Sequence, residues 1–142
     1  DIGSSNDFLL KLISGSMPAC PKIHMGYIDV RDVAKAHIFS MTEEKTNGER
    51  MIVSENEMFF AEVGKTLNEA GFKKSPTKEM PNFLVKIMSL FVGELKGLLS
   101  ALDRKGDIDK TKAKSFFNWD YISTEQSVTE TAQQLQDMGL TK

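Results

Sequence analysis

Apolar positions near the start of the chain recur at helical spacing. They are Phe8, Leu9, Leu12 and Ile13. Ser4 and Ser5 precede this run, and Gly15 follows it. Hydroxyl residues cap helix N-termini and glycine commonly ends helices. The pattern therefore predicts a short helix with a hydroxyl N-cap and a glycine stop.

A strand and a longer helix are predicted next. The segment 26–30 (GYIDV) combines aromatic and β-branched residues, which favour a strand. Asp29 and Asp32 place carboxylates at the cap and in the first turn of a helix, where they oppose the positive end of its dipole. The apolar stripe of this helix consists of Val33, Ala34, His37, Ile38 and Met41. On that stripe, His37 is interpreted as a core histidine.

The strand–helix alternation continues with a strand at 50–54 (RMIVS) and a helix at 56–71 that ends at Gly71. One face of that helix carries Phe60, Val63, Leu67 and Ala70. Alternating strands and helices with short connections favour an α/β fold over an all-helical one. We therefore expect an α/β chain that is mostly helical with a few short strands.

Residues 83–102 are mostly apolar and are long enough to raise the question of a membrane span. Lys86, Glu94 and Lys96 fall inside this segment, and each charge costs about 2.5–3.5 kcal/mol on insertion scales. We expect no membrane span here, but two helices that break near residues 93–97 and pack on the domain.

The last third of the chain predicts two further helices. A short helix spans about 111–117, and a loop with Trp119 and Tyr121 follows it. Ser123 or Thr124 then caps a final helix that ends at Gly139.

Composition excludes several classes of function. The net charge of -2 gives no long-range attraction for nucleic acid, and the basic residues of 104–114 alternate with acidic ones, which predicts a solvated face. Cys20 is the only cysteine, so an internal disulfide is excluded and a reducing compartment such as the cytoplasm is expected. Neither histidine belongs to a ligand-spaced cluster, so no metal site is expected.

The 142 residues suffice for one domain, and no basic-then-apolar leader is visible. The chain begins at Asp1 with a polar stretch that is typical of the middle of a protein. We therefore expect residues 1–142 to form a single partial domain of something longer.

Four ordered segments together resemble the extended short-chain dehydrogenase/reductases. They are 4–21 (SSNDFLLKLISGSMPACP), 26–41 (GYIDVRDVAKAHIFSM), 47–67 (NGERMIVSENEMFFAEVGKTL) and 109–120 (DKTKAKSFFNWD). The resemblance is to the dihydroflavonol and aldehyde reductase branch of the NAD-dependent epimerase/dehydratase superfamily. It implies the C-terminal, substrate-binding portion of a Rossmann-type NAD(P)-dependent oxidoreductase. Phe117 and Asn118 replace the leucine and glycine of the family's last motif.

The same family carries a G-x-x-G-x-x-G turn for the dinucleotide and a Tyr-x-x-x-Lys pair for proton transfer. Neither spacing occurs in this chain, where Arg31 and Glu125 lie four residues after Tyr27 and Tyr121. Without the tyrosine and lysine the expected proton transfer has no agent. We expect no catalytic residue in this chain, no bound NADP or NAD on the chain alone, and cofactor binding only in an intact enzyme.

Some residues are still candidates for ligand contact. The resemblance implies that Ser4 and Ser5 approach the cofactor, although a plain N-cap explains them equally well. Tyr27 either lines the substrate cleft or belongs to the core, with the core favoured. Substrate contacts are also predicted for Phe83, Ile87, Met88 and Phe91, although a helix–helix core explains the same pattern. For Arg31 and Asp32, helix capping and a local ion pair are favoured over shaping of the cleft.

Met25 narrows the substrate class. Relatives that act on nucleotide sugars often have an arginine at this position to bind the diphosphate, and a thioether cannot neutralise phosphate. The resemblance therefore implies a small carbonyl substrate, with a nucleotide-sugar epimerase or dehydratase fragment as an alternative. A non-catalytic interaction module is a second alternative. We also expect helix 31–42 and strand 50–53 to leave an apolar surface that promotes self-association.

Overall fold

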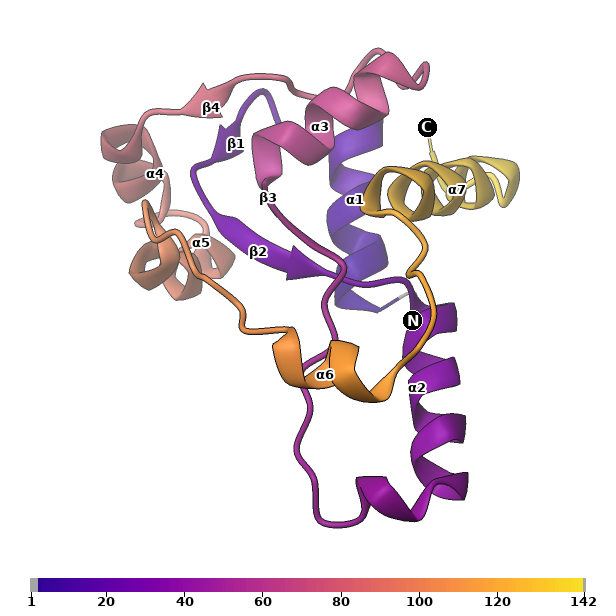
Figure 1. Cartoon of the computed structure of the whole chain (residues 1–142). Helices are drawn as coiled ribbons and strands as arrows, with labels where there is room; N and C mark the ends of the chain where they lie inside the picture. The colour runs from indigo at the N-terminus through magenta and orange to yellow at the C-terminus, as the bar shows by residue number, and fades with distance from the viewer. Residues whose placement is uncertain (1–2, 142) are drawn as a thin grey trace.

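The computed structural model describes residues 3–141, and three helices form its centre (Figure 1). Helices α1 (Ser4–Ser14), α3 (Phe60–Glu69) and α7 (Thr124–Asp137) pack together, because each presents a row of apolar side chains to the others. The cluster between them includes the fully buried Leu12, Ile23, Val63, Leu67 and Ala132. This cluster is the main hydrophobic core of the described residues.

Short strands lie beside these helices. In the described residues, β1 (Cys20–Pro21) pairs in parallel with β4 (Glu79–Met80), and β2 (His24–Tyr27) pairs antiparallel with β3 (Asn56–Phe59). The predicted α/β class, mostly helical with a few short strands, is confirmed.

The two strands predicted at 26–30 and 50–54 do not lie where the sequence placed them. Strand β2 ends at Tyr27 because Asp29 already caps the next helix. The predicted strand at 50–54 is wrong: these residues form no regular structure, and pairing starts at Asn56. Met51 and Val53 pack instead against a small aromatic cluster, so their apolar character serves packing without backbone pairing. The helix predicted at 56–71 accordingly begins only at Phe60.

Helix α1 matches its predicted end but not its predicted cap. Gly15 ends the helix in the left-handed conformation, with a φ of 78°. The cap at the start is Gly3, so the prediction that Ser4 or Ser5 caps the helix is wrong. Both serines lie in the first turn with exposed side chains.

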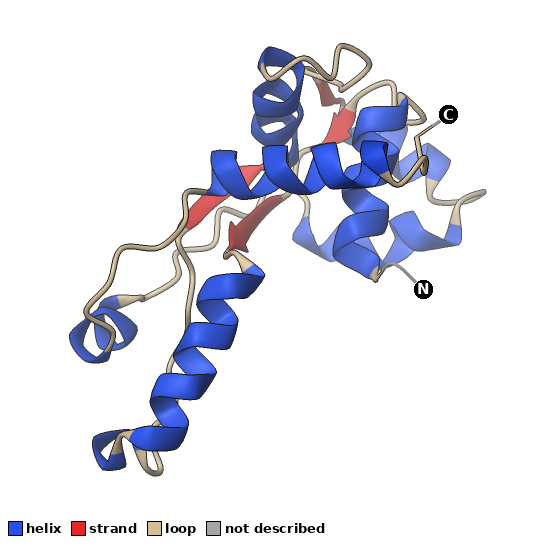
Figure 2. Ribbon diagram, turned by 90° about the vertical axis from the view of Figure 1, so that its right-hand side faces the viewer, coloured by secondary structure: helices blue, strands red, loops and turns tan. Residues whose placement is uncertain are grey.

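Helix α2 (Val30–Thr42) projects away from the main core, as Figure 2 shows most clearly. The middle of α2 packs on α6 (Thr111–Phe116) through a second cluster, in which Ala36 meets Ala113 and Phe117. The short helix η1 (Glu44–Thr46) follows at its tip. The predicted start at Asp29 is confirmed, because the Asp29 side chain accepts a hydrogen bond from the backbone N–H of Arg31.

The apolar stripe predicted for α2 is largely exposed. Ile38 is 65% exposed and Met41 is 85% exposed. The interpretation of His37 as a core residue is wrong, because its ring is exposed and contacts the backbone oxygen of Val33 through Nδ1. Ile38 and Met41 thus leave apolar surface exposed on α2, as the sequence predicts, whereas self-association through this surface stays a prediction.

The apolar segment 83–102 is broken, as predicted, but at a different place. Helix α4 (Asn82–Met88) and helix α5 (Gly93–Leu98) are separated by residues 89–92, and η2 (Leu99–Ala101) follows α5. Residues 93–97, the predicted break, are helical. Among the residues that the structure describes, none of the helices has the length and apolar content needed to cross a bilayer.

Candidate functional site

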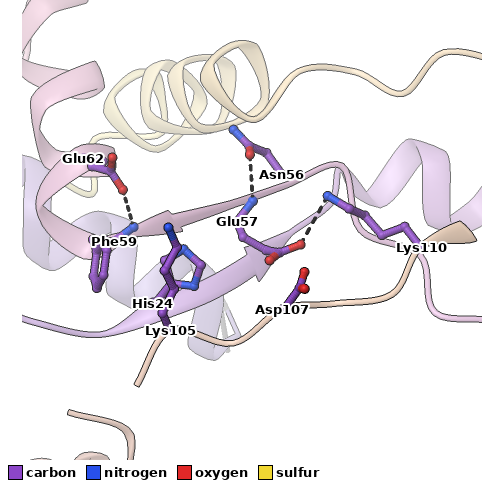
Figure 3. A pocket seen from close by; sticks show the side chains of 8 residues that line it. All are labelled: His24, Asn56, Glu57, Phe59, Glu62, Lys105, Asp107 and Lys110. Carbon is purple, nitrogen blue, oxygen red and sulfur yellow. Dashed lines mark hydrogen bonds and ion pairs between the residues drawn. The ribbon is translucent and has the colours of Figure 1, made fainter. Parts of the chain in front are cut away.

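A shallow hollow of about 360 Å³ lies against strands β2 and β3 (Figure 3). It is lined by His24, Asn56, Glu57, Phe59, Glu62, Lys105, Asp107 and Lys110. The antiparallel register builds it, because His24 faces Phe59 across the ladder and Gly26 faces Glu57. The rings of His24 and Phe59 lie 4.7 Å apart between centroids. The fold thus gathers aromatic and charged groups from three separate segments.

Residues 103–110, which we call the strap, close one side of the hollow. The Glu57 carboxylate accepts a hydrogen bond from the Ile108 N–H at 3.4 Å and pairs with Lys110 Nζ at 3.2 Å. Lys110 Nζ also donates to the backbone oxygen of Glu55. Burial opposes ionisation of Glu57, but these partners outweigh it, and the pKa of its carboxyl lies below the ordinary value. Glu57 therefore holds the strap to the strands as an anion.

The remaining groups decide what the hollow can do. Lys105 and Asp107 are exposed at its rim and form no hydrogen bond or ion pair among the described residues. The hollow can accept a small polar molecule, but its lining holds no tyrosine hydroxyl and no thiol. Within residues 3–141, no three His, Cys, Asp or Glu side chains are grouped to hold a metal ion. The arrangement supports binding without supplying the groups of carbonyl reduction.

A network of charged groups joins α2 to α7. Arg31 donates to both oxygens of Asp29 at 2.9 Å and to Glu130 of α7 at 2.7 Å. The bond from the Arg31 side chain holds the pKa of the buried Asp29 carboxyl well below its ordinary range. Asp32, also buried, accepts a hydrogen bond from the backbone N–H of Ile122. Helix capping and a local ion pair were predicted for Arg31 and Asp32. The ion pair of Arg31 is with Asp29, which also caps α2. Asp32 instead holds the loop before α7.

The residues predicted to touch the cofactor lie at the start of α1. Ser4 and Ser5 extend from the first turn of α1, and the hollow does not include them. Cys20 is fully buried, and burial raises the pKa of its thiol to about 11, so a nucleophilic role is unsupported.

Tyr27 is half-buried against the main core, which agrees with the favoured interpretation. Its hydroxyl is buried without a hydrogen-bond partner among the described residues. Burial raises the pKa of this hydroxyl, so it stays protonated at neutral pH.

The predicted substrate contacts on α4 are exposed. Phe83, Ile87, Met88 and Phe91 line neither the hollow against β2 and β3 nor a second one beside Lys22 and Asp103. Neither of these two hollows brings them together with Ser4, Ser5 or Tyr27. Substrate contact by these residues stays a prediction.

Sequence reasoning missed the members of the hollow. Glu57 was assigned to a helix, and Lys105, Asp107 and Lys110 were assigned to a solvated face. Lys110 is in fact half-buried in an ion pair. Glu57 and Lys110 are far apart in the sequence, so no local spacing could indicate their contact.

Solved structures with the same fold define the class of the chain. The structure of yeast methylglyoxal/isovaleraldehyde reductase Gre2 with NADPH superposes with a TM-score of 0.67 at 26% identity, covering 94% of this chain and 39% of the reductase. Gre2 of Candida albicans with NADPH gives a TM-score of 0.66 at 23% identity, covering 94% of this chain and 36% of that one. The chain thus has the fold of the C-terminal portion of a Rossmann-type NADPH-dependent reductase.

Curated relatives make the assignment more specific. The NADPH-dependent methylglyoxal reductase GRE2 of Saccharomyces cerevisiae is 30% identical over 115 residues, which are 81% of this chain and 30% of the relative. An oxidoreductase of Schizosaccharomyces pombe is 37% identical over 81 residues, 57% of this chain and 21% of that protein. No family profile matches the chain. These relatives are Gre2-like NADPH-dependent reductases of the extended short-chain dehydrogenase/reductase family, and the chain corresponds to their C-terminal portion.

Proposed function

We propose that the chain is the substrate-side portion of an NADPH-dependent reductase of small aldehydes and ketones. The observation that carries this proposal is the match to yeast methylglyoxal reductase, in which 30% identity over 115 residues accompanies the common fold. The chain spans only 30% of the length of that relative. The activity is therefore proposed for a protein that also has a dinucleotide-binding portion.

The residues present in the chain limit which steps of carbonyl reduction it can carry out. NADPH, when bound, supplies the hydride that reduces the carbonyl carbon. Proton delivery to the carbonyl oxygen needs a Tyr-x-x-x-Lys pair, which residues 1–142 lack. We therefore propose that the chain alone is inactive, and that it contributes substrate enclosure and specificity as a single partial domain.

Two serines fit the cofactor chemically. The exposed hydroxyls of Ser4 and Ser5 stand in the first turn of the eleven-residue helix α1. A helix N-terminus with free hydroxyls suits the oxygens of a phosphate or a carboxamide. We propose that these serines donate hydrogen bonds to the cofactor once the dinucleotide-binding portion is in place.

Met25 supports a small, uncharged substrate. Its side chain is 48% exposed on β2, where it presents a thioether rather than a cation. A sugar-nucleotide diphosphate would find no counter-charge from this residue. We propose simple carbonyl compounds in preference to nucleotide sugars, and a reducing, cytoplasmic setting in keeping with the free thiol of Cys20.

The α2 face is proposed as the contact surface for the dinucleotide-binding portion. Val30, Ile38 and Met41 are largely exposed along it, and Ile52 adds to it from the adjoining loop. Monomeric proteins seldom leave such a face in water. The isolated chain is therefore expected to cover this face by self-association.

A graft tests the proposed function directly. The dinucleotide-binding portion of yeast Gre2 is joined to this chain in place of its own matched region, and NADPH oxidation is followed at 340 nm with methylglyoxal or isovaleraldehyde. We expect turnover well above that of either part alone. UDP-sugars should give none. A folded graft that binds NADPH but reduces neither aldehyde would contradict the proposal, and the yeast enzyme itself is the positive control.

A further inference from the structure

The strap, residues 103–110, is anchored to the domain at both of its ends. Asp103, at the first end, adopts a left-handed backbone conformation with a φ of 59°, which aspartate tolerates better than most residues. Its N–H donates to the backbone oxygen of Lys22 at 3.0 Å. Its carboxylate pairs with Lys22 Nζ at 3.4 Å and accepts a hydrogen bond from the Asn82 side chain. These contacts fix the point at which the strap begins.

Lys110 forms the second anchor. Its ammonium lies 3.2 Å from a carboxylate oxygen of Glu57 and donates to the backbone oxygen of Glu55 at 3.1 Å. The side chain of Lys110 is 23% exposed and that of Glu57 is 14% exposed, so water weakens this pair less than it weakens a surface pair. The Glu55 carboxylate in turn accepts hydrogen bonds from the N–H and the hydroxyl of Thr124, at the start of α7. The second anchor is therefore tied to a helix of the main core.

The part of the strap between the anchors is held much more weakly. Lys105, Gly106 and Asp107 are exposed and form no hydrogen bond or ion pair within residues 3–141. Figure 3 shows Lys105 and Asp107 beside the two strands, where they line the hollow. The Ile108 N–H reaches Glu57 only at 3.4 Å, which is long for a hydrogen bond. A segment with so few bonds opens locally at a free energy below that of global unfolding.

Ile108 supplies the closest packing contact of this part. Its side chain lies over Gly26 of β2, because a Cβ built on Gly26 would be 2.4 Å from Ile108 Cδ1. Gly26 lies in an extended strand and its φ is not positive, so the backbone itself does not require glycine there. The missing side chain of Gly26 therefore serves as a seat for Ile108.

We infer that residues 104–109 form a lid over the hollow, latched by the contact of Ile108 with Gly26. The anchors at Asp103 and Lys110 stay in place while Ile108 leaves its seat and the residues between them swing outward. Opening of the lid widens the space between the strap and strands β2 and β3, so that a small polar molecule can enter. The inference does not depend on the proposed reductase activity.

Substitution of Gly26 by alanine tests the latch, because the new Cβ displaces Ile108 whereas an extended backbone accepts alanine. NMR spectroscopy of the full chain measures the exchange rate of the Ile108 amide and the heteronuclear Overhauser effects of residues 104–107. In the unsubstituted chain, the Ile108 amide should exchange at least about tenfold faster than that of Leu67, which belongs to the main core. Gly26→Ala should speed exchange at Ile108 by about a further tenfold and lower the Overhauser effects, with little change at Leu67.

A second variant reaches the latch from the other side. Ile108→Ala removes the side chain that sits on Gly26 and should produce the same two changes. Addition of Gly26→Ala to Ile108→Ala should have little further effect, because both substitutions break one contact. Lys105→Ala is the matched control, since Lys105 is an exposed residue of the lid. It should leave both measurements as they are in the unsubstituted chain.

Two results would overturn the inference. Exchange at Ile108 as slow as at Leu67 in the unsubstituted chain would show that the strap opens only when the whole fold opens. Unchanged exchange and unchanged Overhauser effects in both Gly26→Ala and Ile108→Ala would show that Ile108 does not hold the strap.

Discussion

Asp29 shows how one side chain fixes the junction between β2 and α2. Its carboxylate caps the helix, receives both arms of the Arg31 guanidinium, and through Arg31 reaches Glu130 of α7. Only 5% of Asp29 is exposed, so water screens these bonds little. The arrangement links two helices whose sequences lie about a hundred residues apart.

Substitution of Asp29 by asparagine should therefore destabilise the chain at neutral pH. Asparagine can still cap the helix, but loss of the charge-assisted bonds from Arg31 costs about 1.5–3 kcal/mol in the free energy of unfolding. The bond from Arg31 holds the folded-state pKa of Asp29 below its ordinary value, so the unfolded chain takes up the proton first as pH falls. The stabilisation is complete above about pH 5 and is lost as pH falls through the folded-state pKa.

Urea unfolding followed by circular dichroism at several pH values checks this prediction. The difference between wild type and Asp29→Asn should be largest at pH 7 and should shrink below about pH 4. Asp107→Asn is the matched control, because Asp107 is exposed at the rim of the hollow without a partner in the described chain. A gap for Asp29→Asn that stays constant down to pH 2 would contradict the account.

At the scale of elements, the starts of α2 and α7 were readable from the sequence, but the cap of α1 and the strand pairings were not. Asp29 and Ser123 mark the starts of α2 and α7 because a cap bonds to a backbone N–H two or three residues away. The start of α3 was also locally encoded, because Glu62 accepts a hydrogen bond from the Phe59 N–H. Strand β3 had no such signal, since its partner β2 lies about thirty residues earlier.

The candidate site was harder to predict for the same reason. Glu57 and Lys110 meet only after the β2–β3 ribbon and the strap are in place. The apolar spacing of the α4 residues was compatible with a helix–helix core or with a pocket wall, but in the structure these side chains are exposed. The spacing could not tell which side of the helix the domain would cover.

Close packing between α3 and the segment before β4 gives a prediction at this scale. A Cβ built on Gly64 would lie 2.0 Å from the backbone oxygen of Pro76, and a backbone atom cannot move aside cheaply. Gly64→Ala should therefore destabilise the chain by about 2 kcal/mol or more.

Gly97→Ala provides a matched control, since Gly97 is also helical and a Cβ there would meet nothing within 4 Å. This variant should be neutral or stabilised by up to about 1 kcal/mol. Thermal unfolding of both variants measures the difference. Equal stability of the two would show that α3 and the Pro76 segment are less tightly packed than described.

At the scale of the whole molecule, the chain combines a packed three-helix centre with exposed apolar side chains on α2 and on α4. The α2 face is proposed for the dinucleotide-binding portion. Its Gre2-like relatives are about two and a half times as long, and the chain corresponds to their C-terminal portion. Neither the glycine-rich turn nor the Tyr-x-x-x-Lys pair occurs in residues 1–142. We therefore propose that the chain selects the substrate and that another portion of the protein binds the cofactor.

Calorimetric titration of NADPH tests whether the chain binds the cofactor without the dinucleotide-binding portion. The cofactor is titrated into the folded chain and, in parallel, into the graft that carries the dinucleotide-binding portion of yeast Gre2. The account predicts saturable one-site binding to the graft and no measurable heat of binding to the chain alone. Micromolar binding of NADPH to the chain alone would contradict it.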